Sequence, residues 1–151
     1  MTMEGISIKE ILITDPEYAG VYDLREETLR KPLGMSLENE DLSADRTDTI
    51  LAAMKDGKVI GCLMLQHKND TTIKLRQMAV ASEWQGRDIG RLLVAQAEET
   101  ARHKSYTRII LHARDVAKGF YEKLGYTAAG DMFTEVGIPH VMMEKDLSPN
   151  P

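Results

Sequence analysis

The sequence has few of the features that would place a protein in an oxidising compartment, in a membrane or on nucleic acid. Cys62 is its only cysteine, so no internal disulfide can form, as expected of an intracellular, cytoplasmic protein. No apolar run approaches the length of a membrane span, and the N-terminal residues lack the basic and then apolar pattern of a secretory leader. The net charge is −5 and the lysines and arginines are scattered, which excludes a basic nucleic-acid surface and favours cationic over polyanionic partners.

The remaining composition is that of one globular domain. With 151 residues, 42% of them hydrophobic and 28% charged, the chain can bury one core. We expect a single domain over residues 1–147 and a frayed tail at 148–151. Hydrophobic periodicity and turn residues predict a mixed α/β sheet of about seven strands. The strands are expected at residues 7–13, 50–54, 59–66, 72–80, 108–113, 127–133 and 140–145, the helices at 17–30, from 89 onward and at 116–124, and an irregular acidic segment at 35–47.

The most informative segment is a glycine-containing loop between a strand and a helix. Residues 85–90 read Q-G-R-D-I-G and follow the extended segment 75–80. Loop N–H groups without intrahelical partners, together with the positive end of the helix dipole, favour a bound phosphate. The spacing fits neither a P-loop nor the G-x-G-x-x-G of dinucleotide folds. The amphipathic helix after the loop has an apolar face formed by Ile89, Leu92, Leu93, Ala97 and Ala101.

This loop resembles the acyl-coenzyme A loop of the GCN5-related N-acetyltransferase (GNAT) superfamily, [QR]-x-x-G-x-[GA], with Asp88 at the central glycine. Aspartate is among the residues that best tolerate the positive φ this position would need. Two further motifs are similar to the family. Residues 117–126 read A-K-G-F-Y-E-K-L-G-Y, and residues 133–143 read F-T-E-V-G-I-P-H-V-M-M, which resembles the ElaA/YjcF-like branch. The resemblance extends over roughly the whole chain and is strongest from Leu75 onward.

The resemblance implies a GNAT-like acyl-CoA N-acyltransferase fold, with a central parallel strand pair splayed around an acetyl-CoA cofactor. It implies that the loop holds the pyrophosphate and that the pantetheine arm pairs with residues 78–80 as an added strand. A backbone N–H near Ala79 or Val80 would face the developing oxyanion. No metal site is expected. The implied cofactor-binding residues are Met78, Ala79, Val80, Gln85, Gly86, Arg87, Asp88, Ile89, Gly90, Arg91, Arg114, Ala117, Phe120 and Tyr121.

Acyl transfer to an amine also needs an acid and a base. Tyr121, within the second motif, is the implied general acid that hydrogen-bonds the leaving sulfur; the alternative is an aromatic residue on a helix face. Because most alkyl amines are protonated at neutral pH, a base is required, and Glu135 and His140 are the candidates. The alternative for both is a hairpin whose polar residues bond to backbone or solvent. His112 lies in an apolar strand expected to be buried on both faces, and we expect it to be a core histidine.

Acceptor recognition is assigned to Glu135, His140 and two arginines of the first helix. Arg25 and Arg30 resemble the L-R-x-x-x-L-R start of the branch and would clamp a carboxylate. The alternative is a solvated or ion-paired helix face. The acidic segment 35–47 would rim the acceptor pocket or be an ordinary soluble loop.

The hypothesis is an acetyl-CoA-dependent N-acetyltransferase that acts on the primary amine of a small molecule by direct transfer in a ternary complex. Cys62 lies in an apolar strand as a packing thiol, so no covalent acyl-enzyme is expected. One alternative, favoured by Asp88 and Arg114, is a non-catalytic acyl-CoA binding or sensing domain of the same fold. Another is a fold that binds no nucleotide and serves interaction. No membrane or nucleic-acid partner is expected, and a homodimer is left open because edge strands often pair in the family.

Overall fold

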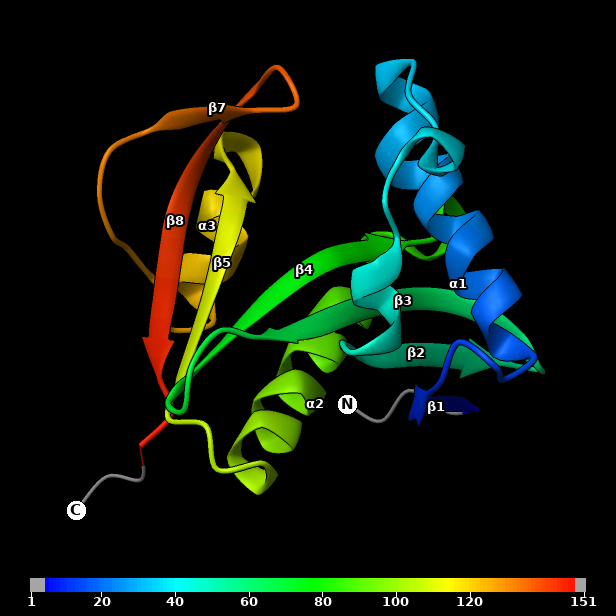
Figure 1. Ribbon diagram of the computed structural model, residues 1–151, viewed down its shortest axis with the longest axis horizontal. Helices are drawn as coiled ribbons and strands as arrows, with labels where there is room; N and C mark the ends of the chain where they lie inside the picture. Colours follow the sequence, from blue (N-terminus) through cyan, green and yellow to red (C-terminus); the bar gives the residue numbers. More distant parts are fainter. Residues whose placement is uncertain (1–4, 149–151) are drawn as a thin grey trace. The chain divides into compact units, whose positions relative to one another are not determined.

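The computed structural model describes residues 5–148, and this part of the chain contains eight strands and three α-helices joined by turns and short helical segments (Figure 1). The hydrogen-bonded strand order is β1-β2-β3-β4-β5-β8-β6, with β7 paired to β8. The mixed α/β sheet is confirmed, with eight strands instead of about seven. The strands are β1 (Ile6–Ile11), β2 (Thr49–Lys55), β3 (Lys58–His67), β4 (Thr72–Val80), β5 (Arg108–Arg114), β6 (Thr127–Ala128), β7 (Phe133–Glu135) and β8 (Ile138–Asp146). The helices are α1 (Glu17–Arg25), α2 (Ile89–His103) and α3 (Lys118–Lys123).

The described residues form two compact units, one of residues 5–66 and 77–97 and one of residues 67–76 and 98–148. Strand β4 and helix α2 each contribute residues to both units. The single domain expected over residues 1–147 stays a prediction, and the end of the expected tail, residues 149–151, lies outside the described residues. No helix among the described residues is long and apolar enough to cross a membrane.

In the first unit, α1 lies along one face of the antiparallel strands β2 and β3 (Figure 1). The approach is close, because a Cβ added at Gly20 would lie 2.8 Å from Cγ2 of Val59. Ile50, Ala52 and Met54 of β2 point to this face, and Leu51 and Ala53 between them are buried as well, so β2 is covered on both faces. The core cluster comprises Ile11, Val21, Leu24, Ile50, Ala52, Met54, Val59, Cys62, Met64, Ala79 and Ala81.

The start of α2 packs on the other face of β3. Successive strand residues point to opposite faces, so Gly61 faces away from its neighbour Cys62. A Cβ at Gly61 would lie 2.9 Å from Cγ2 of Ile89 and 3.0 Å from Cδ1 of Leu93. Ile89 and Leu93 are buried, which confirms that they belong to the apolar face predicted for this helix.

In the second unit, β5 is the central strand. It pairs in parallel with β4, with residues 108–111 opposite residues 72–75, and antiparallel with β8 over residues 108–114. The parallel pair expected from the family resemblance is therefore present. Helix α3 lies behind β5 and β8 in the view of Figure 1.

Burial alternates along β5, so the expectation of a strand buried on both faces is wrong. Ile109, Leu111 and Ala113 are buried, whereas Ile110 and His112 are half-buried. On the half-buried face, side chains of β5 make polar contacts to the neighbouring strands, His112 to Lys74 of β4 and Arg108 to Glu144 of β8.

A buried polar network joins α2, β8 and the residues after α3. Lys145 Nζ donates to both carboxylate oxygens of Glu98, at 3.0 and 3.1 Å, and to the Leu124 carbonyl oxygen at 2.8 Å. The Tyr126 hydroxyl donates to Glu98 Oε2 at 3.0 Å. Burial, followed by the neighbouring Glu98 carboxylate, raises the pKa of Tyr126 well above its ordinary value. The network therefore fixes the end of α3 against the strands.

Helix α3 is followed by a left-handed glycine, close to the helix end predicted at residue 124. Gly125 has a φ of +96°, and its N–H donates to the Glu122 carbonyl oxygen at 3.0 Å. The Tyr126 N–H donates to the Tyr121 carbonyl oxygen at 3.1 Å, which completes a Schellman motif. The N-terminus differs from the prediction, because residues 115–117 form a 3-10 turn and α3 begins at Lys118. Asp115 accepts a hydrogen bond from the adjacent Val116 N–H and does not cap α3.

Two other predicted elements are divided in the structure. The strand expected at residues 127–133 is wrong as a single element, since β6 and β7 pair separately with β8. Gly130, with a φ of +100°, interrupts the extended chain between them. The helix expected at residues 17–30 ends as α1 at Arg25, and residues 26–30 form a π-helical turn. Gly34, in the left-handed region, ends the 3-10 turn that follows.

Candidate active site

The loop predicted to hold phosphate lies in the first unit, between β4 and α2. Residues 85–88 are exposed, and Gly86 has a φ of +76° with nothing within 4 Å of the position a Cβ would take. The side-chain amide of Gln85 donates to the Val80 carbonyl oxygen at 3.0 Å, which ties the loop to the end of β4. The Arg87 guanidinium lies 5.1 Å from the centre of the Trp84 ring.

Asp88 occupies the position of the family's central glycine and adopts the left-handed conformation, with a φ of +67°. Its Oδ2 lies 3.4 Å from Nη2 of Arg91, and its Oδ1 lies 3.5 Å from Arg91 Nε. The substitution is therefore compatible with the loop in both respects that matter. Aspartate tolerates the backbone conformation, and the Arg91 guanidinium offsets the carboxylate charge.

The first turn of α2 provides backbone donors. The Leu92 N–H donates to the Asp88 carbonyl oxygen at 3.0 Å, which makes Asp88 the N-cap. The N–H groups of Ile89, Gly90 and Arg91 then precede the first intrahelical hydrogen bond. These donors, the open space at Gly86 and the balanced charge of Asp88 fit the pyrophosphate of an acyl-coenzyme A. At the end of β4, Ala79 is buried and Met78 and Val80 are half-buried.

The two arginines predicted to recognise a carboxylate bind carboxylates of their own chain. Arg25 is 1% exposed, and its Nη1 donates to Asp45 Oδ2 at 2.8 Å. Arg30 donates to both oxygens of Glu40, at 2.5 and 3.0 Å. The structure brings the arginines together at Gln77, whose Oε1 accepts from Arg25 at 3.3 Å and from Arg30 at 3.4 Å.

An open pocket of about 490 Å³ lies beside Asp45 in the first unit. The Tyr18 hydroxyl donates to Asp45 Oδ2 at 2.5 Å, and burial together with this carboxylate raises the pKa of Tyr18 to about 12. Two aspartates of the acidic segment 35–47 therefore face one hollow. The pocket is lined by Ile13, Tyr18, Asp41, Leu42, Ser43, Asp45 and Arg46.

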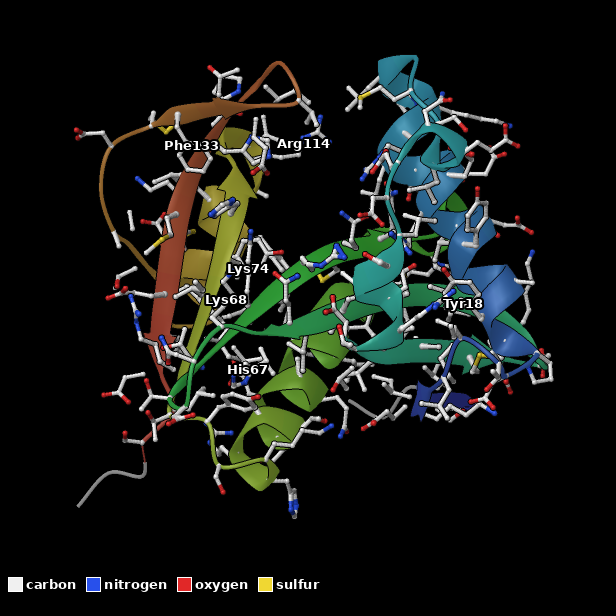
Figure 2. The ribbon with its side chains drawn as sticks, in the orientation of Figure 1. Tyr18, His67, Lys68, Lys74, Arg114 and Phe133 are labelled. Carbon is white, nitrogen blue, oxygen red and sulfur yellow. The ribbon has the colours of Figure 1, made fainter. Side chains whose placement is uncertain are left out.

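In the second unit, Glu135 of β7 lies between two histidines. Its Oε1 lies 2.9 Å from His112 Nδ1, and its Oε2 lies 3.7 Å from His140 Nε2. The Phe133 ring packs edge-on against His112, with 4.9 Å between centroids, and stacks on His140 at 6.0 Å. Figure 2 shows Phe133 and Arg114 at the same end of β5 and β8. The structure thus brings the two predicted bases together and adds His112.

A hydrogen bond to the backbone shows that Nδ1 of His140 carries a hydrogen. Its Nδ1 lies 2.8 Å from the Ile138 carbonyl oxygen, and a carbonyl only accepts, so Nδ1 carries a hydrogen and Nε2 faces Glu135. The three side chains differ in exposure, which is 6% for His140, 27% for His112 and 44% for Glu135. His112 and Glu135 are therefore the members of this group that solvent reaches.

Sequence reasoning missed two residues of this cluster. His112 was expected to be a core histidine, and Lys74, whose Nζ lies 3.5 Å from His112 Nδ1, was not considered. Burial lowers the pKa of Lys74, and the Glu135 carboxylate opposes this shift. The available signal was the spacing of two residues between His112 and Arg114, because alternate residues of a strand share one face.

The second motif places Tyr121 on α3 with little exposure. Tyr121 is 7% exposed, and burial raises its pKa to about 12. Its ring contacts Phe120 and Tyr126 edge-on, with centroids 5.0 and 5.8 Å apart. Among the described residues, none hydrogen-bonds to the Tyr121 hydroxyl, so this group is protonated at neutral pH and free to donate to a ligand. Phe120 and Arg114 are exposed, and Ala117 is half-buried in the turn before α3.

Cys62 is a packing thiol, as predicted. It is 0% exposed, and burial raises the pKa of its thiol to about 12. Its Sγ lies 3.7 Å from the Gln77 carbonyl oxygen. Residues 5–148 contain no group of three or more His, Cys, Asp or Glu side chains that could hold a metal ion.

The mixed sheet, with β4 and β5 as its parallel pair, has the strand arrangement of the acyl-CoA N-acyltransferase fold. Residues 14–147 match the family model described as "Acetyltransferase (GNAT) domain". The chain belongs to this family.

Several known proteins are similar to this chain in sequence or in fold. YyaT, an uncharacterized protein of Bacillus subtilis, is 38% identical over 79 residues, which cover 52% of this chain and 53% of YyaT. The chain thus spans about half the length of the relatives it matches in this way. Escherichia coli ElaA has a TM-score of 0.82 at 16% identity, covering 93% of this chain and 99% of ElaA. A GNAT family acetyltransferase from Elizabethkingia anophelis, solved with acetyl-CoA bound, has a TM-score of 0.72 at 20% identity, covering 95% and 99%. These similarities confirm the predicted fold.

Proposed function

We propose that the protein transfers the acetyl group of acetyl-CoA to the primary amine of a small molecule, directly in a ternary complex. The observation that carries this proposal is the loop at the start of α2, where Asp88 caps the helix at a positive φ and Arg91 offsets its charge. Membership of the GNAT family and the acetyl-CoA bound to the Elizabethkingia anophelis relative support the same cofactor.

Acetyl-CoA supplies the acetyl group as a thioester. We assign its pyrophosphate to the backbone N–H groups and side chains of residues 85–91, and its pantetheine arm to the backbone of residues 78–80. The N–H near Ala79 or Val80 stabilises the oxyanion. Arg114, Ala117 and Phe120 complete the assigned contacts, and Arg114 acts only as a donor.

Tyr121 is assigned the general acid. With the pKa of Tyr121 at about 12 and an ordinary thiol near 8.5, full proton transfer to the leaving sulfur is uphill by about 5 kcal/mol. The hydroxyl therefore acts by hydrogen-bonding the sulfur as negative charge develops. Burial supports this role, because it keeps the phenol protonated throughout the physiological range.

The cluster that contains Glu135 and His140 is assigned removal of the amine proton. A carboxylate between two imidazoles, partly open to solvent, has the composition of a general base. Recognition of an acceptor carboxylate by Arg25 and Arg30 stays a prediction, and it would require both to exchange the ion pairs they make with Asp45 and Glu40.

A binding titration and an activity screen test the proposal. Calorimetry with acetyl-CoA should give micromolar binding, and a screen of primary amines should then identify acceptors by thiol release. Binding without turnover on any amine would favour the non-catalytic sensing alternative, for which Arg114 remains as support. Absence of binding would contradict both. Tyr121→Phe is the control variant, because a sensor would lose nothing from this change.

A further inference from the structure

We propose that Nε2 of His112 is the atom that takes the proton from the acceptor amine, with Glu135 as the positioning residue that orients the His112 ring. This inference rests on the proposed acetyl transfer and assigns one step of it to a residue outside the three family motifs. Lys74, His112 and Glu135 all belong to the second unit.

The contacts of His112 Nδ1 determine which tautomer the neutral ring adopts. Its Nδ1 lies 2.9 Å from Glu135 Oε1 and 3.5 Å from Lys74 Nζ. A carboxylate only accepts and an ammonium only donates, so Nδ1 cannot satisfy both at once. The shorter distance and the carboxylate charge favour Glu135, which leaves the hydrogen on Nδ1 and a lone pair on Nε2. Nothing in the described chain hydrogen-bonds to Nε2.

The basic groups of the cluster differ in how accessible they are to an acceptor amine. His140 is 5% exposed, its Nδ1 donates to the Ile138 carbonyl oxygen, and its Nε2 faces Glu135. Glu135 has one oxygen beside each imidazole. Of the two imidazoles, His112 is therefore the one that carries an uncommitted Nε2 on a partly exposed side chain, and Glu135 is engaged through Oε1 in holding its ring.

The neighbours of His112 determine how well its ring holds a positive charge. When Nε2 takes a proton, His112 becomes an imidazolium that donates to the Glu135 carboxylate at 2.9 Å, which stabilises the positive charge. The other groups that contact the ring are Lys74 from β4 and Phe133 from β7, and His140 from β8 lies on the other side of Glu135. The Lys74 ammonium opposes the imidazolium, but the Glu135 carboxylate lies closer to Nδ1, at 2.9 Å against 3.5 Å for Lys74 Nζ.

The proton balance closes. An alkylammonium gives one proton to His112 Nε2, and the neutral amine forms a C–N bond to the thioester carbonyl carbon. The C–S bond breaks, the second proton of the nitrogen reaches the sulfur by way of Tyr121, and the products are the acetamide and the free thiol. His112 then returns its proton to solvent.

Imidazole nitrogen NMR on the full chain labelled with ¹⁵N-histidine tests the geometry without any substrate. Long-range proton–nitrogen correlations identify which ring nitrogen carries the hydrogen, and His112→Gln assigns the signals. Neutral His112 should carry its hydrogen on Nδ1 in the natural protein and in Lys74→Met. In Glu135→Ala, Lys74 becomes the remaining partner of Nδ1, so the hydrogen should move to Nε2. A hydrogen on Nε2 in the natural protein, or no change in Glu135→Ala, would overturn the inference.

Kinetics test the role, with the primary amine of highest turnover in the acceptor screen as the probe. His112→Gln should lower kcat/KM for the amine about 10²- to 10³-fold at pH 7. The deficit should shrink about tenfold per pH unit as pH approaches the amine's own pKa near 10.4, because the amine then deprotonates unaided. A merely structural role gives a deficit that does not depend on pH. The matched control is His103→Gln, an exposed histidine at the end of α2, which should leave the rate unchanged.

Calorimetry with acetyl-CoA separates the two hypotheses. If the natural protein acetylates the amine and His112→Gln is equally active and binds acetyl-CoA equally well, this inference is overturned and the proposed function stands. Natural protein that acetylates no amine would overturn both. Loss of turnover in His112→Gln with acetyl-CoA binding within about twofold of the natural value would support the inference.

Discussion

The carboxylate of Asp88 lies 3.4 Å from the guanidinium of Arg91, one helical turn further along α2. Both side chains are 48% exposed, so the pair adds little to the stability of the fold. The pair matters instead for the binding of a phosphate group at the proposed loop. There the Asp88 carboxylate would repel the phosphate unless a cation such as Arg91 lies beside it.

The Asp88–Arg91 pair predicts a non-additive effect on cofactor binding. Arg91→Ala should weaken acetyl-CoA binding about tenfold, because it leaves the Asp88 carboxylate facing the phosphates. Asp88→Gly should change the dissociation constant much less, and Asp88→Gly combined with Arg91→Ala should recover part of the loss. Calorimetry on the four proteins measures the coupling. Strictly additive effects would show that the pair does not form in the cofactor-binding state.

Arg25 and Asp45 form a buried ion pair, with side-chain exposures of 1% and 2%. Arg25→Met should lower the free energy of unfolding by about 3–5 kcal/mol, because it removes the guanidinium that pairs with the buried Asp45 carboxylate at 2.8 Å. Arg25→Met combined with Asp45→Leu should recover most of this loss. Urea unfolding gives both values. Lys31→Met serves as the control, since its pair with Glu27 is more than half exposed, and it should leave the midpoint unchanged. A stable Arg25→Met single variant would contradict the interpretation.

Tyr121→Phe should lower kcat about 10²-fold while the dissociation constant for acetyl-CoA stays within about twofold. Because burial raises the pKa of Tyr121 to about 12, the acidic form persists until pH approaches that value. Activity that depends on this proton should therefore show no loss on the alkaline side between about pH 7 and 10. The pH profile of kcat at saturating amine checks this, and an alkaline loss that disappears in Tyr121→Phe would refute it.

Lys145 is predicted to stabilise the second unit through Glu98 and the end of α3. Lys145→Met should cost about 2–3 kcal/mol of unfolding free energy, because it removes the nearer of two cations from the buried Glu98 carboxylate and the donor from the Leu124 carbonyl oxygen. Glu99→Gln is the control one residue away, at a side chain 63% exposed, and should have no measurable effect. Denaturant midpoints for both variants, measured side by side, decide the prediction.

Local sequence signals predicted the parts of the site that are built from neighbouring residues. The loop at residues 85–91 lies as expected between a strand and a helix, because glycine, the N-cap and the apolar face of the helix are all encoded within a few positions. Gly125 likewise ends α3, because a left-handed residue after a helix is a local requirement.

The base cluster could not be predicted in the same way, because it depends on strand register. Glu135 and His112 are 23 positions apart in the sequence, and they meet because β7 and β5 both pair with β8. The partners of Arg25 and Arg30 were missed for a different reason, because Asp45 and Glu40 come from a segment without the hydrophobic periodicity that would indicate where its side chains lie. Even the break between β6 and β7 depends on one left-handed glycine, Gly130, whose conformation the apolar pattern does not show.

The burial of Cys62 has a practical consequence for enzymology. It is the only cysteine of the chain, it is 0% exposed, and the pKa of its thiol is raised to about 12. A disulfide reagent that reports free thiolate at neutral pH will therefore find almost none on the folded protein. Every equivalent of chromophore released during turnover then counts one molecule of coenzyme A, and a slow rise without amine would instead report unfolding of the first unit.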